Sequence, residues 1–239
     1  MNRPVVAWLV IVAGTALTYP LGFAIGVPAL IPFLNAAPAV PLMYLSLRDG
    51  RTGHAIGRML LWAAVMGICA TWLSWRWPDE SARLFLNGDA YRREMFDWIR
   101  TGIGAESTPR LFLPNHARHA AIFCALSLLT GSVLSMPMGA ALMNYMGHFV
   151  GALAAAGPHP WLVAPMAWVP WSLVRIVSFV TLGVVLAGPV LSRLGGFTFS
   201  LRAHRKLILI AAGGLLIDVT MKALLAPTWQ MMLKRAVGW

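Results

Sequence analysis

The sequence predicts an all-α fold, a polytopic bundle of about seven transmembrane helices, with six as the alternative count. Hydrophobic residues make up 59% of the 239 residues and charged residues only 11%, and the mean hydropathy is +0.70. Because an average soluble domain has roughly 25% charged residues, this composition excludes a water-soluble domain. It also excludes a disordered chain, which would be polar. Apolar stretches of about 20 residues, the length of a helix that crosses a bilayer, recur along the chain.

Residues 1–58 are predicted to form an N-terminal membrane unit that ends in a basic loop over 48–58. The stretch 4–47 carries no charge and is far longer than the apolar part of a cleavable signal peptide. We expect one span near 5–25 and a second, broken span near 28–47; one tilted span with a re-entrant piece is the alternative. Proline kinks or ends a helix, and five prolines interrupt the stretch: Pro20, Pro28, Pro32, Pro38 and Pro41.

Residues 59–239 are predicted to form a five-span membrane domain. Tight turns are expected at Met136-Pro137-Met138 and at Gly157-Pro158-His159-Pro160, and a second basic loop covers 188–206. The one long polar segment is 76–110. The expected spans cover about 59–75, 112–135, 139–156, 161–187 and 207–227.

The segment 76–110 has the pattern of a folded, amphipathic interfacial unit. Asp79 can cap a short helix that stops at Asn87-Gly88, and Asp89 can cap a second helix that stops near Gly102. In the second helix an apolar face contrasts with charged side chains on the remaining surface, which is typical of a helix in the headgroup region. This face is either a cap over the ends of the spans or a docking surface for a partner. It consists of Tyr91, Met95, Trp98 and Ile99.

The net charge of +11 would indicate nucleic acid in a soluble protein. Here most of the positive charge falls at one side of the predicted bundle, on the N-terminus and the two basic loops. The expected partners are therefore membrane lipids, and no nucleic acid is expected to bind. Raw counts of Lys and Arg are equal on the two sides, but the basic loops are shorter. The positive-inside rule then favours a cytoplasmic N-terminus and a C-terminus outside.

Three charged side chains lie deep in the predicted spans. Arg175 and Asp218 fall near the midpoints of spans six and seven, and Lys222 follows Asp218 by one helical turn. Charges at membrane depth usually pair or line a polar cavity. We expect an Arg175–Asp218 contact, with Lys222 as a competing partner, and the pair is either structural or part of an ion-linked site.

Four histidines are candidate metal or cofactor ligands, because a neutral imidazole binds metal ions, haem iron or pigment magnesium. No carboxylate with ligand spacing accompanies them in the predicted spans, and Cys69 and Cys124 have the pattern of buried hydrophobic residues. No cofactor is therefore predicted, and a haem or pigment site is the alternative. The histidines are His116, His119, His148 and His159.

Small residues crowd the fourth and fifth predicted spans. They include Gly131, Gly139 and the pair Gly147 and Gly151, which has the spacing that lets two helix backbones approach closely. The pattern indicates helix packing, either within the chain or with another subunit or a second copy.

The stretch from about residue 59 to 227 resembles the stage II sporulation protein M family of bacterial membrane proteins. Asn115 precedes an apolar run that reaches Gly131, as in the family's Asn-led helix with a glycine in mid-span. The segment Leu142 to Gly147 resembles a family motif, with Tyr145 in place of a glycine of that motif. The turn Gly157-Pro158-His159-Pro160 resembles the turn that opens the family's next span. Asp218 and Pro227 resemble the end of the family's last span, but Val163 stands where an acid is frequent. The resemblance implies a multi-pass protein of the bacterial cytoplasmic membrane that assembles with partners.

Three functions fit the sequence. The first is a non-enzymatic scaffold or accessory subunit of a larger inner-membrane complex, since Gly-x-Ser-x-Gly, His-Glu-x-x-His and P-loop motifs are absent from the sequence. It would dock partners through 76–110 and the small-residue helix faces. The second is a transporter or permease subunit in which Arg175 and Asp218 line a path. The third is a haem- or pigment-associated subunit.

Overall fold

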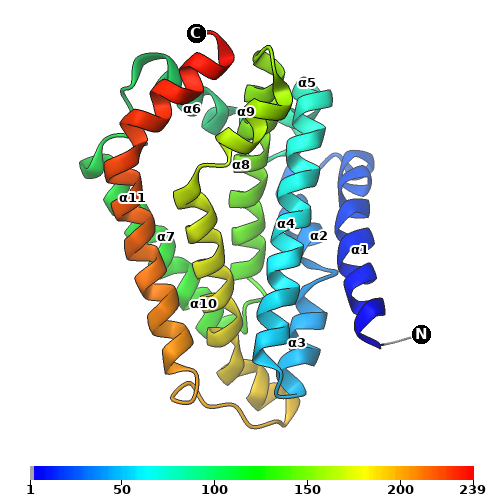
Figure 1. Ribbon diagram of the computed structural model, residues 1–239. Helices are drawn as coiled ribbons and strands as arrows, with labels where there is room; N and C mark the ends of the chain where they lie inside the picture. The colour runs from blue at the N-terminus through cyan, green and yellow to red at the C-terminus, as the bar shows by residue number, and fades with distance from the viewer. Residues whose placement is uncertain (1–2) are drawn as a thin grey trace.

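The structure, a computed structural model, describes residues 3–239, and within them it contains helices and no strand (Figure 1). The predicted all-α class is confirmed. Short helices are η1 (Pro28–Leu30), α2 (Ile31–Ala36), α3 (Val40–Arg48), α5 (Pro78–Leu84), α6 (Gly88–Thr101) and α9 (Pro160–Ala167). Long helices are α1 (Arg3–Ile25), α4 (Thr52–Arg76), α7 (Pro109–Thr130), α8 (Ser135–Ala156), α10 (Pro170–Gly195) and α11 (Arg205–Val237).

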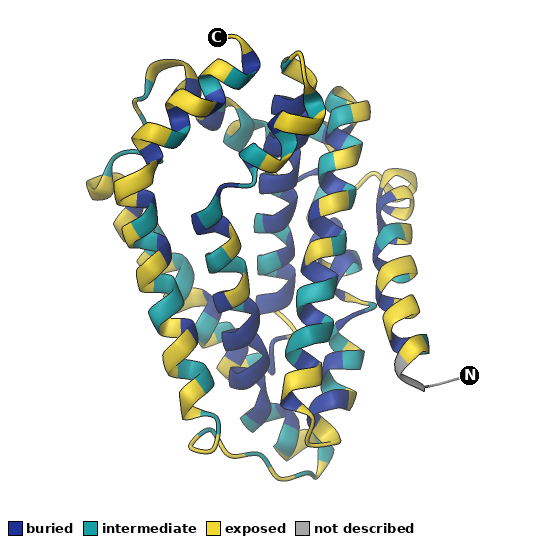
Figure 2. Ribbon diagram, in the orientation of Figure 1, coloured by how far each residue is buried: buried dark blue, intermediate teal, exposed yellow. Residues whose placement is uncertain are grey.

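Five helical stretches are long and apolar enough to cross a membrane: Val5–Ile25, Pro28–Arg48, Thr52–Arg76, Pro170–Gly195 and Arg205–Val237. Helices α7 and α8 run beside them in the bundle but do not meet the same test. Helix α8 lies at the centre and is mostly buried (Figure 2), so protein surrounds it instead of lipid. The expected count of seven membrane crossings stays a prediction.

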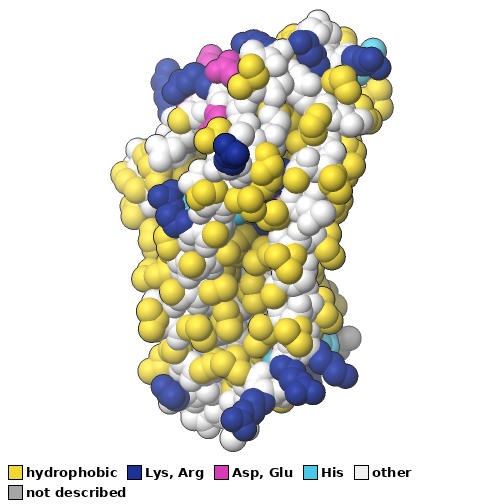
Figure 3. Space-filling model, turned by 90° about the vertical axis from the view of Figure 1, so that its left-hand side faces the viewer, with side chains coloured by type: hydrophobic (Ala, Val, Ile, Leu, Met, Phe, Trp, Pro, Cys, Tyr) yellow, Lys and Arg dark blue, Asp and Glu magenta, His cyan; other side chains and the backbone are white. Residues whose placement is uncertain are grey.

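On the face shown in Figure 3, charged side chains lie mostly toward the two ends of the bundle. Apolar side chains cover the middle of the face shown, Lys and Arg lie at both ends, and the visible Asp and Glu gather at one end. The N-terminal end of α1 and the α10–α11 connection lie at the opposite end of the bundle from the C-terminus (Figure 1). This is the separation that a membrane with two aqueous faces requires.

The proline-rich second stretch is broken, as the sequence predicts. Helix α2 ends at Ala36 and α3 begins at Val40, with Pro38 between them. The Asn35 side chain at this break donates to Thr18 Oγ1 at 2.6 Å and accepts from Asn144 at 2.9 Å. These bonds tie α2 to α1 and α8 inside the bundle, where a buried amide without partners would be costly.

The expected span over 161–187 is wrong in its bounds. The chain forms α9, breaks at Trp168 and Val169, and then forms α10, which continues to Gly195. Pro170 causes the break, because the residue before a proline is disfavoured in the helical region, and Val169 is extended with ψ 139°. As a consequence Arg175 lies in the second turn of α10 and not near the middle of a span.

Three further boundaries differ from expectation. The turn before α8 covers 131–134, and Met136 to Met138 lie inside the first turn of α8 because a proline is tolerated there. Helix α4 begins at Thr52, which shortens the first basic loop. Helix α11 continues past Pro227 to Val237, beyond the end expected for the last span near residue 227. The turn at Gly157 to His159 is confirmed.

Helix α8 packs closely on α4 through its glycines. A Cβ atom added to Gly147 would lie 2.5 Å from the Ala70 side chain, and one added to Gly151 would lie 2.7 Å from Ser74 Cβ. The small-residue pattern therefore serves packing inside the chain. One hydrophobic core joins residues of α1, α2 and α3 with α4, α8 and α10, so the division expected at residue 58 does not separate two cores.

Helices α5 and α6 cover one end of the bundle. Their expected starts are displaced: Asp79 and Asp89 lie in the first turns and make no cap hydrogen bond, while Trp77 and the left-handed Asn87 occupy the cap positions. The end of α6 at left-handed Gly102 is as predicted, because glycine adopts this conformation without strain. Helix α5 ends at Leu84, earlier than expected.

The apolar face of α6 is turned into the protein. Met95, Trp98 and Ile99 are at most 1% exposed and share a core with α8, α9 and α11, and Tyr91 packs beside them. The prediction that this face docks a partner is wrong, because the chain's own helices already cover it. The alternative, a cap over the bundle, describes what α6 does.

Candidate functional site

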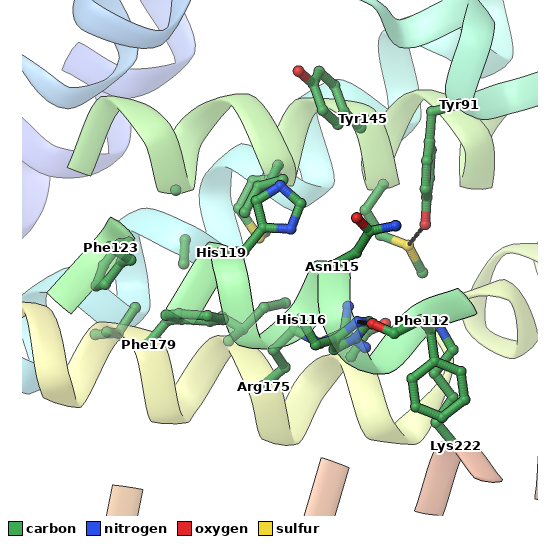
Figure 4. Close-up of a pocket in the computed structure, with 18 of the residues that line it drawn as sticks. Tyr91, Phe112, Asn115, His116, His119, Phe123, Tyr145, Arg175, Phe179 and Lys222 are labelled. Carbon is green, nitrogen blue, oxygen red and sulfur yellow. Dashed lines mark hydrogen bonds between the residues drawn. The ribbon is translucent and has the colours of Figure 1, made fainter. Parts of the chain in front are cut away.

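A cavity of about 300 Å³ lies between α7, α8 and α10 and is partly open. We call it the α7–α8–α10 pocket. Helix α6 and the connection 102–108 contribute to its wall at one end through Tyr91, Glu94 and Glu106, and α11 contributes Lys222. Helices α7 and α8 are close together near the turn that connects them, and they diverge toward α6 (Figure 4). The cavity lies where they diverge.

The pocket has an apolar end and a polar end. At the apolar end Phe123 of α7 and Phe179 of α10 meet edge to face, with ring centroids 4.8 Å apart, and Met136 and Val180 complete the wall. The polar side chains lie farther along α7 and α10, toward Lys222 (Figure 4). An apolar cavity with a few placed polar groups is the usual form of a small-molecule site.

Arg175 and Asp218 form the expected contact. Arg175 Nε donates to Asp218 Oδ2 and Arg175 Nη2 donates to Asp218 Oδ1, both at 2.8 Å. This parallel, two-point geometry is the strongest form of an arginine–carboxylate pair. Asp218 is 1% exposed and lies behind the wall, whereas Arg175 lines the pocket. Asp218 therefore holds Arg175 in place, and the expectation that both residues line a path is correct only for Arg175.

Lys222 has a different partner from the one expected. Its Nζ donates to Glu106 Oε1 at 2.7 Å and lies 4.6 Å from the centre of the Phe112 ring. Lys222 is 1% exposed and Glu106 is 13% exposed, so this is a desolvated ion pair. It fastens the connection 102–108 to α11 beside the pocket.

His116 and His119 both line the pocket. Figure 4 shows His119 and Asn115 on the side of α7 toward α8, and His116 on the side toward Arg175. His116 Nδ1 lies 2.9 Å from the carbonyl oxygen of Phe112, so this nitrogen carries a proton and donates. His116 Nε2 is buried without a hydrogen-bond partner in the described chain and lies 4.0 Å from Asp218 Oδ2.

The other two candidate histidines lie elsewhere. His148 is fully buried behind α5 and α6, where its Nδ1 lies 3.0 Å from Ser74 Oγ and 3.2 Å from Ser81 Oγ, and its Nε2 lies 3.6 Å from Asp89. His159 precedes α9. Among residues 3–239 no group of three or more His, Cys, Asp or Glu side chains could hold a metal ion. The four histidines thus do not form one site.

The predicted glycines have separate roles around the pocket. Gly131 ends α7 in the left-handed conformation, φ +59°, against Leu191, and Gly139 lines the apolar end of the pocket. A Cβ atom added to Gly139 would lie 3.6 Å from Phe123, an ordinary contact. Gly139 is therefore a position from which a larger side chain would enter the cavity.

Tyr91 places its hydroxyl in the polar end, where it donates to Met146 Sδ at 3.8 Å. Burial, and then the negative charge of Glu106, raise the pKa of Tyr91 well above its ordinary value. The phenol is therefore a neutral hydrogen-bond donor at physiological pH.

Sequence reasoning missed Glu106 and Asn115 as parts of this site. Glu106 falls in the polar segment 76–110, outside the predicted spans. Three charges deep inside the predicted spans, Arg175, Asp218 and Lys222, include two bases and one acid, and a buried base requires a counter-ion. This imbalance is the signal in the sequence that points to an acid outside the spans.

Comparison of the chain with protein-family models, curated proteins and solved structures found no match.

Proposed function

We propose that the chain is a membrane transport protein, a carrier or permease subunit, that binds an amphiphilic molecule in the α7–α8–α10 pocket. The observation that carries this proposal is the division of the pocket into an apolar end at Phe123 and Phe179 and a polar end at Arg175 and His116. A molecule with one apolar part and one polar part is complementary to both ends. No catalytic step is proposed.

The location of the pocket supports transport. Helix α10 forms one wall of the pocket, and α4 adds Trp62 and Ala63; both helices belong to the stretches able to cross a membrane. Buried charged residues in helices of this kind commonly mark a substrate pathway or a structural pair. Arg175 fits both descriptions, because Asp218 holds one edge of its guanidinium and the residue also lines the pocket.

We place the protein in the bacterial cytoplasmic membrane, with the end that holds the N-terminus and the connection 196–204 in the cytoplasm. The basic residues of that end support this orientation under the positive-inside rule. They include Arg48, Arg51, Arg202, Arg205 and Lys206.

A scaffold subunit is the competing proposal. The α6 face and the glycines Gly147 and Gly151, on which docking was expected to rest, are in contact with the chain's own helices. A haem- or pigment-bearing subunit is the third proposal, and it has only His116 and His119 near one cavity. The α7–α8–α10 pocket favours transport over both.

The experiment compares small molecules that remain bound after mild-detergent purification. Gly139→Leu fills the apolar end of the pocket. Gly213→Leu is the matched control, because a Cβ atom at Gly213 of α11 has no neighbour within 4 Å. Mass spectrometry of the extracted material is expected to find an amphiphile near one per chain in the wild type and the control, and less than a third of that in Gly139→Leu. Equal contents in all three proteins would contradict the proposal, and visible absorption bands would favour the third proposal.

A further inference from the structure

A second hollow lies between α4 and α10, which run side by side in the bundle (Figure 1). Its volume is about 320 Å³, and we call it the α4–α10 groove. The residues that line it are hydrophobic, apart from Gly67. At its rim Ile68 is 69% exposed, and Leu173 and Val177 are each 49% exposed. Because both helices belong to stretches able to cross a membrane, such a rim faces the hydrocarbon of the bilayer.

One layer of side chains separates the α4–α10 groove from the α7–α8–α10 pocket. Three residues line both hollows: Ala63 of α4, Met143 of α8 and Ile176 of α10. We call these three residues the partition. Ala63 is 2% exposed and Met143 is 8% exposed, so they lie at the base of the groove, below its exposed rim. The pocket therefore lies directly behind a groove that is open to lipid.

Met143 is the part of the partition that can move most easily. Its side chain is unbranched and has three rotatable bonds. A Cβ atom added to Gly67 would lie 3.4 Å from Met143 Cε and 3.0 Å from Trp168 Cζ2. The methyl group of Met143 and the Trp168 ring thus both lie over the bare backbone of Gly67, on the groove side of the partition.

We propose that the α4–α10 groove is the lateral entrance of the α7–α8–α10 pocket, and that its occupant is the hydrocarbon chain of an amphiphile dissolved in the bilayer. The chain lies first in the groove, and rotation of the Met143 side chain then lets it pass the partition. This inference rests on the proposed function and adds the route by which the ligand arrives. Met143 is then a residue that sets the rate of entry.

The apolar wall of the groove favours entry from the bilayer over entry from water. A hydrocarbon chain that passes from lipid into the groove exposes no new apolar area to water, since lipid chains and the side chains of the groove are equally apolar. Along α10, Ile176 of the partition lies between Arg175 at the polar end of the pocket and Phe179 at the apolar end. The entrance therefore reaches the middle of the pocket, from which both parts of an amphiphile find their place.

The test follows the entry of hexadecanol with a photoreactive diazirine in its chain, a neutral single-chain amphiphile, into the protein in lipid nanodiscs. Samples are illuminated at increasing times after the probe is added, and labelled residues are identified by mass spectrometry. Phe123 reports on the pocket, because it lines the apolar end and is 2% exposed. Probe that remains in the surrounding lipid does not reach it, so labelling of Phe123 measures entry.

Ala64→Phe fills the groove from α4, and Ala212→Phe is the matched control at an exposed alanine of α11 outside both hollows. The initial rate of Phe123 labelling is expected to fall about tenfold in Ala64→Phe, as for a barrier raised by about 1.4 kcal/mol. The control is expected to match wild type.

Met143→Ile keeps a hydrophobic side chain of similar size in the partition but stiffens it by branching at Cβ. This variant is expected to slow the labelling of Phe123, whereas the labelling reached at long times stays that of wild type. If Ala64→Phe does not fold, Met143→Ile decides.

Three results would overturn the inference. They are no labelling of Phe123 in the wild type, equal initial rates in the wild type and both variants of the entrance, and a smaller particle mass in Ala64→Phe with unchanged labelling, which would show that a second subunit covers the groove. These results leave the proposed function standing if Gly139→Leu still loses a bound amphiphile. If Gly139→Leu and wild type retain the same molecules, the proposed function fails first.

Discussion

Arg175 of α10 and Asp218 of α11 are joined by two parallel hydrogen bonds of 2.8 Å, and only Arg175 faces the pocket. The pair thus contributes both to the packing of α10 on α11 and to the wall of the pocket. Asp218, which is almost fully buried, aligns two helices and holds the guanidinium at the pocket wall. Lys222 and Glu106 repeat this arrangement one turn farther along α11.

Asp218→Asn is expected to destabilise the protein. The variant leaves the Arg175 guanidinium without its counter-ion, and breaking such a pair costs about 3 kcal/mol. Thermal unfolding in detergent measures the loss, and Arg202→Gln in the exposed connection after α10 is the control. The double variant Arg175→Asp/Asp218→Arg is expected to recover part of the loss. If Asp218→Asn unfolds as wild type does, the pair is not structural.

Glu106→Gln is expected to cost more stability than the double variant Glu106→Gln/Lys222→Met. The single change leaves a buried ammonium unpaired, whereas the double change replaces both charges, which is often nearly neutral. A difference of at least about 1 kcal/mol is expected from a double-mutant cycle, measured by unfolding in detergent. Equal losses in the two variants would show that Lys222 does not depend on Glu106.

Gly151→Ala is expected to separate α8 from α4. The added Cβ would lie 2.7 Å from Ser74 Cβ and 2.8 Å from the backbone nitrogen of Trp75, and overpacking of this kind costs about 1–3 kcal/mol. Gly213→Ala, which adds a methyl group in open space, is expected to stabilise α11 slightly because alanine favours helix. Thermal unfolding compares the two. A harmless Gly151→Ala would contradict the close α4–α8 contact.

The sequence was sufficient for the helical class and for the Arg175–Asp218 contact, because apolar length and the cost of buried charge are local properties. It was not sufficient for the central place of α8. Asn144 and His148 lie on this helix and are buried, so protein surrounds these polar side chains where an apolar sequence alone would suggest lipid. The break at Pro170 was missed although proline signals it, and Glu106 was missed because its partner lies 116 residues away.

The stability of the protein is expected to fall above about pH 10 partly through Tyr91. Burial raises the pKa of Tyr91 in the folded state, while the unfolded phenol ionises near pH 10. The unfolded state then binds fewer protons, so the free energy of unfolding decreases as pH rises, by up to about 1.4 kcal/mol per pH unit for one group. Tyr91→Phe is expected to show a shallower decline between pH 10 and 11. Identical declines in the unfolding midpoints would contradict the burial of this phenol.

The central claim is that the α7–α8–α10 pocket holds an amphiphile. The most direct measurement is an experimental structure of the protein purified in lipid nanodiscs. The account predicts elongated non-protein density with one end between Arg175 and His116 and the other beside Phe123 and Phe179. A pocket closed by its own side chains, or one that contains only water, would contradict it.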